Sequence, residues 1–226
     1  MNVLVIGAGK GIGLELVNYY LRNDHTVYAV SRDLKNLQKI TTKGLNFCKV
    51  DIATSSGRAD LEQWVLDIPV QLDVVVITAG VLIKKNWTDL TEEDFTTLYT
   101  TNVFGVFDAV RRILPRIKKQ GGHIVTIGSM GGVSGALKFP GMIFYSSSKA
   151  ALSNLTECLA VELAEDGIHV NCLALGAVET DMKNAAFPEF KAPHTPYQMA
   201  SFIGEFSIHH GSFFNGKTLP VSISTP

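Results

Sequence analysis

The first twenty residues combine a strand, a glycine-rich turn and a helix, and this order constrains the fold most strongly. Residues 2–6 form an apolar run rich in β-branched side chains, which predicts a buried parallel strand. The turn follows as Gly7-Ala8-Gly9-Lys10-Gly11-Ile12-Gly13, and residues 14–20 carry apolar side chains at helical spacing. Glycines permit a tight turn and a helix N-terminus presents free N–H groups, so this order predicts a pyrophosphate-binding element. A purely structural glycine turn is the alternative.

Strands and helices alternate along the rest of the chain. The pattern predicts strands near 2–6, 26–31, 45–50, 73–77, 122–128, 168–174 and 218–223, and helices near 11–23, 33–40, 57–67, 91–118 and 144–165. This alternation predicts an α/β fold with a doubly wound parallel sheet of about seven strands and helices on both faces. Because no linker divides the chain, we expect one domain over residues 1–226.

Composition excludes several classes of function. The formal charge is −1 and only 18% of residues are charged, which leaves no basic patch of the nucleic-acid-binding kind. No apolar run is long enough to span a membrane, and the first strand follows Met1 too closely for a signal peptide. The three cysteines and six histidines have no metal-site spacing, so we expect no metal. Reduced, buried thiols indicate a cytoplasmic protein.

Tyr145 and Lys149 form a candidate pair for proton transfer. They are four residues apart in a predicted helix, so the phenol and the ammonium share one face. A nearby cation favours the phenolate and should lower the pKa of the tyrosine toward the working range. Ser129, after the predicted strand 122–128, could hold a substrate oxygen beside the phenol. The spacing alone is common, and a surface aromatic–cation pair is the alternative.

The ordered set of motifs resembles the short-chain dehydrogenase/reductase family over nearly the whole chain. The set consists of Gly7-x-x-x-Gly11-x-Gly13, Asn102, Ser129, Tyr145 and Lys149, in that order. The resemblance implies a Rossmann-like domain, a nicotinamide cofactor, and hydride transfer coupled to proton transfer through Tyr145. It also implies that Lys149 assists the tyrosine, Ser129 orients the substrate oxygen and Asn102 supports a water-linked proton relay.

Most of the expected cofactor contacts are carried over from the same family. The glycine loop, the end of the second strand and the resemblance together assign the cofactor to Gly7, Gly9, Lys10, Gly11, Ile12, Gly13, Ser31, Arg32, Asp51, Ile52, Ala79, Gly80, Tyr145, Lys149, Gly176, Val178 and Thr180. Two residues depart from the family pattern. Thr78 replaces the usual asparagine before Ala79, and Leu175 replaces the usual proline before Gly176.

The end of the second strand favours NADP(H) over NAD(H). An acidic residue there would bind the ribose hydroxyls of NAD and repel a 2′-phosphate. Ser31 and Arg32 instead offer a hydroxyl and a guanidinium, and Lys10 adds a second cation within the glycine loop. Asp33 is the counter-argument, because it is acidic and only one residue further along the chain.

The sequence therefore predicts an NADP(H)-dependent oxidoreductase that interconverts a carbonyl and an alcohol. The alternative is a catalytically silent dinucleotide sensor or scaffold protein of the same fold. It is favoured by the departures at Thr78 and Leu175 and by a short lid region, where Pro188, Pro193 and Pro196 should interrupt any long helix. The sequence does not identify the small-molecule substrate.

Two further expectations concern surfaces. Residues 135–144 should line one wall of the pocket, and Leu137, Phe139, Met142 and Phe144 could contact an apolar substrate or pack elsewhere. The predicted helix 144–165 has apolar positions on more than one face, which favours a homodimer or homotetramer.

Overall fold

Seven parallel strands form the sheet of the computed structural model, which describes residues 1–223. The strands are β1 (Asn2–Ile6), β2 (Thr26–Ser31), β3 (Leu45–Lys49), β4 (Val74–Ile77), β5 (His123–Ser129), β6 (His169–Leu175) and β7 (Thr218–Val221). Their order in the sheet is β3-β2-β1-β4-β5-β6-β7. The chain therefore changes direction across the sheet between β1 and β4, and the carboxyl ends of strands beside such a switch point form a natural ligand crevice.

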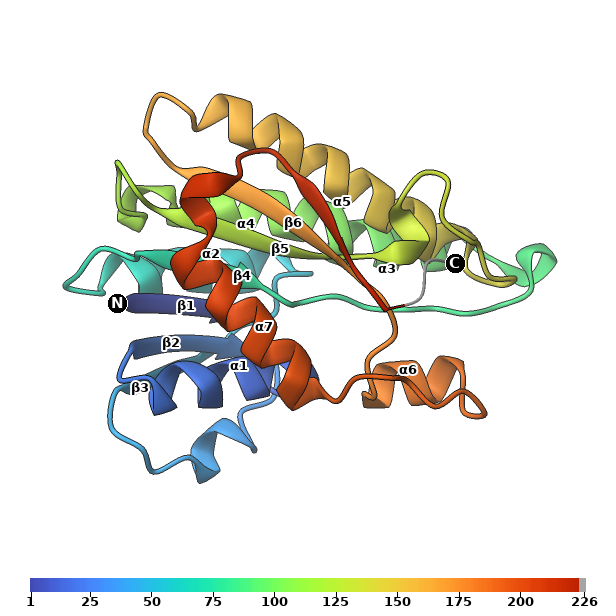
Figure 1. Cartoon of the computed structure of the whole chain (residues 1–226), viewed down its shortest axis with the longest axis horizontal. Helices are drawn as coiled ribbons and strands as arrows, with labels where there is room; N and C mark the ends of the chain where they lie inside the picture. The colour runs from blue at the N-terminus through green and yellow to red at the C-terminus, as the bar shows by residue number, and fades with distance from the viewer. Residues whose placement is uncertain (224–226) are drawn as a thin grey trace.

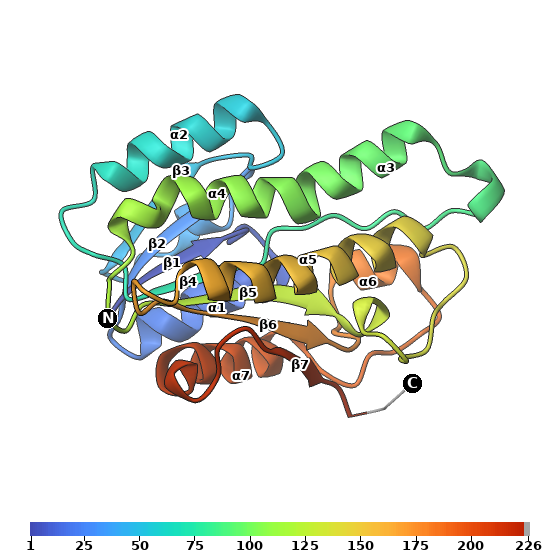
Figure 2. The same cartoon turned by 90° about the horizontal axis from the view of Figure 1, so that it is seen from above.

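Helices cover both faces of the sheet (Figure 1 and Figure 2). They are α1 (Gly11–Arg22), α2 (Ser55–Leu66), α3 (Glu92–Tyr99), α4 (Gly105–Ile113), α5 (Ile143–Glu162), α6 (Asp181–Ala186) and α7 (Pro196–His209). Helices α1 and α7 pack together on one face, while α2, α4 and α5 cover the other. This arrangement confirms the predicted doubly wound sheet.

Alternation along the central strands builds one core on each face. In β1, Leu4 and Ile6 point toward the α2, α4 and α5 layer, and Val3 and Val5 point toward α1 and α7. All four side chains are fully or almost fully buried. Strands buried on both faces explain why the apolar runs in the sequence are continuous.

The predicted helix 91–118 is interrupted in the structure. Thr91 and Asp94 form a capping box at its start, and α3 ends at Tyr99. A five-residue π-helical segment follows at Thr100–Phe104, then α4 and a 3₁₀ turn at Leu114–Arg116. Single π-helical turns inside α-helices are frequent at functional sites, and this one contains Asn102.

Helix α7 is absent from the sequence prediction, which took the prolines after residue 187 as obstacles to a long helix. Pro196 occupies the first turn of α7, where the missing N–H group is not needed. Thr195 and Gln198 form a capping box at the same end. The predicted helix near 33–40 is also wrong, because only the 3₁₀ turn Leu37–Lys39 forms there.

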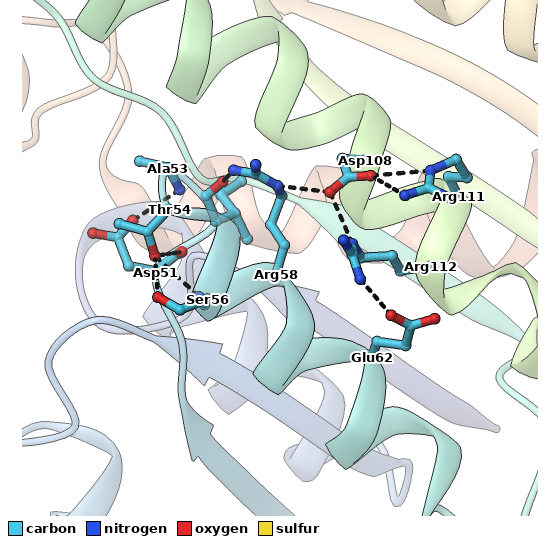
Figure 3. A network of polar contacts seen from close by, with 11 residues as sticks. Asp51, Ala53, Thr54, Ser56, Arg58, Glu62, Asp108, Arg111 and Arg112 are labelled. Atoms are coloured by element: carbon cyan, nitrogen blue, oxygen red, sulfur yellow. Dashed lines mark hydrogen bonds and ion pairs between the residues drawn. The ribbon is translucent and has the colours of Figure 1, made fainter.

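An ion network joins α2 to α4 (Figure 3). Asp108 accepts hydrogen bonds from Arg58 Nε at 2.7 Å, Arg111 Nη2 at 2.6 Å and Arg112 Nε at 2.8 Å. Burial alone would raise the pKa of Asp108, but the hydrogen bonds from the three arginines outweigh burial and hold that pKa well below its usual range. Arg58 Nη1 also donates to the Ile52 carbonyl at 2.8 Å, which connects the network to a predicted cofactor residue.

A second buried polar group lies beneath α7. His123 Nδ1 is 2.9 Å from the Ser207 carbonyl, and Nε2 is 3.1 Å from Asn171 Nδ2. Since Asn171 Oδ1 accepts from the Lys217 N–H, its Nδ2 donates to His123, and His123 is therefore a neutral imidazole protonated at Nδ1. Burial lowers the pKa of His123 from 6.5 to about 4.

This histidine should make the folded state sensitive to mild acid. Above pH 6.5 His123 is neutral in both the folded and the unfolded chain, so its contribution does not change with pH. Between pH 6.5 and about 4 only the unfolded chain takes up the proton, and the free energy of unfolding should fall by about 3 kcal/mol. Urea unfolding across this range measures the loss. It should largely disappear in His123→Gln and persist in His209→Gln, and an unchanged slope in His123→Gln would contradict the assignment.

In residues 1–223 no helix has the length and apolar character needed to cross a bilayer. Nor do the described residues contain a cluster of three or more histidine, cysteine or acidic side chains arranged to bind a metal ion.

Candidate active site

A cleft of about 1080 Å³ opens at the carboxyl ends of the strands. Ile6 of β1 is level with Val30 of β2 and Ile77 of β4, so the loops that follow these three strands meet at one edge of the sheet. Every residue predicted to bind the cofactor lines this cleft. They are Gly7, Gly9, Lys10, Gly11, Ile12, Gly13, Ser31, Arg32, Asp51, Ile52, Ala79, Gly80, Tyr145, Lys149, Gly176, Val178 and Thr180.

The glycine loop is packed so closely that side chains would not fit. Gly7 has φ +99°, and a Cβ there would lie 2.4 Å from the Ala79 nitrogen. A Cβ on Gly13 would lie 2.2 Å from the Gly7 carbonyl oxygen. The Thr78 hydroxyl lies 3.1 Å from both the Ile6 and the Gly7 carbonyl oxygens, so this departure from the family pattern holds the loop in place.

The first turn of α1 follows the loop directly. Lys10 is the N-cap residue of α1, and its side chain forms no capping hydrogen bond with this helix. A Cβ on Gly11 would have Thr180 at 3.6 Å as its nearest neighbour, so the loop is covered from the side by the segment after β6. The helix N-terminus therefore faces the cleft with its N–H groups available to an anion.

Exposed cations surround the end of β2. Lys10 and Arg32 both line the cleft and are solvent-exposed. Asp33, the residue that argues for NAD, accepts a hydrogen bond from the Lys35 N–H at 2.9 Å and lies 4.0 Å from its ammonium group. Asn36, which the sequence analysis missed, donates to the Gly9 carbonyl at 3.0 Å and ties this segment to the glycine loop.

Ser129, Tyr145 and Lys149 meet in the middle of the cleft. Ser129 ends β5, and Tyr145 and Lys149 lie one turn apart near the start of α5. The Lys149 ammonium is buried and donates to the Ile127 carbonyl at 2.8 Å. The three side chains thus come from a strand end and a helix that pack against each other.

The electrostatics differ from the expectation that Lys149 lowers the tyrosine pKa. Burial raises the pKa of Tyr145, and a hydrogen bond with the Ser129 side chain offsets only part of that rise. Burial lowers the pKa of Lys149 to about 8. Because desolvation dominates both groups, their pKa values are displaced in opposite directions.

Asn102 lies behind the cleft rather than in its wall. Its Oδ1 accepts from the Val81 N–H at 2.8 Å, and its Nδ2 donates to the Val81 carbonyl and to Ser148 Oγ, both at 3.0 Å. A Cβ on Gly80 would lie 3.2 Å from Asn102 Oδ1 and 3.4 Å from Lys149 Nζ. The asparagine and the lysine therefore approach Gly80 together.

The wall opposite the glycine loop is apolar. Phe139 and Met142 line it as predicted, but Leu137 and Phe144 do not. Phe144 packs instead against Phe95 of α3, because the start of α5 turns this side chain away from the cleft. The lid, which consists of α6 and the residues after it (181–190), adds three lining residues that the sequence did not point to: Met182, Phe187 and Phe190.

A model of the short chain dehydrogenase family matches residues 1–190. The chain belongs to this family.

Two curated short-chain dehydrogenase relatives cover most of the chain. The 3-oxoacyl-[acyl-carrier-protein] reductase FabG of Chlamydia pneumoniae is 29% identical over 197 residues, which is 84% of this chain and 78% of the relative. The 7alpha-hydroxysteroid dehydrogenase of Escherichia coli (strain K12) is 30% identical over 205 residues, covering 85% and 78%. Among solved structures, ElxO with NADP bound has a TM-score of 0.85 at 28% identity and covers 97% of this chain and 96% of its own.

Proposed function

We propose that this short-chain dehydrogenase is an NADP(H)-dependent oxidoreductase that interconverts a carbonyl and an alcohol, with Tyr145 as general acid/base. The observation that carries the proposal is the meeting of Ser129, Tyr145 and Lys149 in the same cleft as the glycine loop. A proton-transfer group, a hydroxyl that can hold an oxygen and a dinucleotide-sized cleft are the components such a reaction requires.

The chain's own residues supply the proton chemistry. In the direction of reduction, the Ser129 hydroxyl holds the substrate oxygen and Tyr145 donates its phenolic proton to that oxygen. A phenol is protonated at neutral pH, as an acid requires, although burial, which raises the pKa of Tyr145, makes it a weaker proton donor. Lys149 and Asn102 both approach Gly80, and together they support a relay of water molecules that returns a proton to Tyr145. When bound, the nicotinamide supplies the hydride to the carbonyl carbon, or accepts it in the reverse direction.

A nicotinamide dinucleotide fits the residues on the other side of the cleft. The glycine loop leaves room for backbone approach, and the first turn of α1 offers N–H groups to the pyrophosphate. Asp51, Ile52, Gly176, Val178 and Thr180 also line the cleft. We expect Asp51 and Ile52 to contact the adenine, and the segment of Gly176, Val178 and Thr180 to contact the nicotinamide and phosphates. ElxO, which is similar over nearly the whole chain, has NADP bound. The preference for NADP over NAD rests on Lys10 and Arg32.

Replacing Arg32 with alanine should weaken NADPH binding by about tenfold or more and leave NADH binding nearly unchanged. A charge-assisted hydrogen bond contributes roughly 1.5–3 kcal/mol, and exposure of Arg32 to solvent reduces that figure. Fluorescence titration of both cofactors measures the effect, with exposed Lys39→Ala as the control. The preference should shrink as salt rises. Equal affinity for the two cofactors in the unmodified protein would show that Arg32 does not bind the phosphate.

The silent sensor or scaffold protein remains the second candidate, and the departures at Thr78 and Leu175 favour it. Thr78, however, supports the glycine loop, and Asn102, Ser129, Tyr145 and Lys149 are all present. Absorbance of NADPH with a panel of ketones, aldehydes and sugars distinguishes the two. Oxidation with at least one substrate supports the enzyme, whereas cofactor binding without oxidation across the panel supports the sensor.

We propose further that the protein acts in the cytoplasm on a small molecule, as one domain over residues 1–226. We expect it to form a homodimer or homotetramer and to bind neither nucleic acid nor membrane. Phe104 and Phe107, on the helices next to α5, are partly exposed, which supports self-association on that side.

A further inference from the structure

The substrate end of the cleft is built from three segments that are distant in the sequence. They are the loop after β4 (82–85), the loop after β5 (133–142) and the lid of α6 with the residues after it (181–190), and all lie at the end of the molecule where the strands finish (Figure 1 and Figure 2). Together they contribute the apolar lining residues Leu82, Phe139, Met142, Met182, Phe187 and Phe190.

Lys84 holds these segments together from outside the cleft. Its ammonium donates to the Ala186 carbonyl at the end of α6 at 2.8 Å and lies 3.8 Å from the centre of the Phe187 ring. Phe187 in turn packs edge-on against Phe139, with ring centres 5.7 Å apart. The neighbouring Lys85 N–H donates to the Gly141 carbonyl at 3.1 Å. Lys84 thus contacts the lid and Lys85 contacts the loop after β5, so both segments are attached to the loop after β4.

Charges at this end of the cleft do not favour an anion. Lys183 is the lid cation among the described lining residues, and its ammonium is paired with Glu179 Oε1 at 2.9 Å and also contacts the Phe190 carbonyl. Asp181 lines the same end and is exposed. Among the lining residues at this end, a carboxylate or phosphate on the substrate body would therefore meet two acidic side chains and a lysine that already has a partner. The exposed Lys84 lies outside the lining, behind the Phe187 ring.

We propose that this end of the cleft binds the apolar, uncharged body of a carbonyl substrate, and that Lys84 is the positioning residue that holds Phe187 against Phe139 to form its wall. The inference rests on the proposed function, since Ser129 and Tyr145 define where the reacting oxygen lies. Burying an apolar ring against this wall is favourable because it removes apolar surface from water. A ring that carries a carboxylate would lose the hydration of its charge without gaining a partner.

Three ketones with the same reacting end test the wall. They are butan-2-one, 4-phenylbutan-2-one and 4-(4-carboxyphenyl)butan-2-one, which differ only in the body that would contact the lid. Initial rates with NADPH should give 4-phenylbutan-2-one a kcat/KM at least tenfold above the other two, because burying one ring contributes about tenfold or more in affinity. A carboxyphenyl ketone that matches or exceeds the phenyl ketone would overturn the proposal.

Two variants test the residues. Lys84→Met removes the ammonium and should raise the KM for 4-phenylbutan-2-one about fivefold or more, with the loss in KM rather than kcat, and Lys84→Arg should restore most of it. Phe187→Ala should lower the advantage of the phenyl ketone over butan-2-one to about threefold or less. Lys43→Met and Phe213→Ala are controls, since both side chains are exposed and outside the cleft lining. If Lys84→Met leaves the KM unchanged, Lys84 does not position the wall.

Binding separates this inference from the proposed function. Calorimetric titration of the three ketones into the protein saturated with NADP⁺ measures affinity without turnover. Tighter binding of the phenyl ketone with no reduction of any ketone supports the apolar wall and contradicts the proposed reaction. Reduction of all three with equal affinities supports the reaction and overturns the wall. If none of the three binds, the wall is overturned.

Discussion

Replacing Tyr145 with phenylalanine should lower kcat/KM for an accepted carbonyl substrate by about 10²–10⁴-fold, which is the usual contribution of a positioned general acid. The substitution removes one oxygen atom and keeps the ring that packs at the start of α5. Ser129 can still hold the substrate oxygen, but the phenolic hydroxyl that contacts this serine and would donate the proton is gone. Initial rates measured by NADPH absorbance give the loss directly.

Cofactor affinity should stay nearly unchanged in the same variant, because the glycine loop, the end of β2 and the first turn of α1 are all intact. Tyr197→Phe is the matched control, since Tyr197 is exposed and outside the cleft lining. Full activity in Tyr145→Phe would refute the role of the phenol.

The sequence predicted the sheet well because its central strands, β1, β2, β4, β5 and β6, are buried on both faces. The β-branched runs at β1 and β4 are short and continuous, so their positions follow from local pattern. Helix α7 was missed because proline was read only as a helix breaker. Pro196 and Thr195 are start signals when they stand at the first turn, and the capping box with Gln198 was visible in the sequence.

The candidate site was predictable where backbone geometry dictates residue type. The glycine loop needs small residues because Gly7 and Gly13 touch neighbouring backbone atoms, and this requirement is readable from their spacing. The wall of Phe139, Phe187 and Lys84 was not predictable, because it depends on three loops meeting in space. The pKa values of Tyr145 and Lys149 also escaped prediction, since helical spacing gives their proximity but not their burial.

The network around Asp108 was likewise invisible to pattern reasoning, and it should dominate the stability of the contact between α2 and α4. Replacing Asp108 with alanine leaves Arg58 without its carboxylate partner while its side chain stays only 7% exposed. Breaking a buried pair by removing one partner costs about 3–5 kcal/mol, which for a chain of this length lowers the melting temperature by roughly 10 °C. Differential scanning calorimetry measures the shift.

The matched control for this prediction is Glu62→Gln. Glu62 pairs with Arg112 at the edge of the same network, but its side chain is 40% exposed, so its loss should cost less than about 1 kcal/mol.

The depressed pKa of Asp108 determines how its stabilisation of the folded state depends on pH. The stabilisation is complete above the unfolded pKa of a carboxyl near 4 and is lost only as pH falls through the lower folded value. The double substitution Arg58→Met with Asp108→Leu should recover much of the stability by removing both charges together. If Asp108→Ala has the same melting temperature as the unmodified protein, Asp108 does not hold α2 against α4.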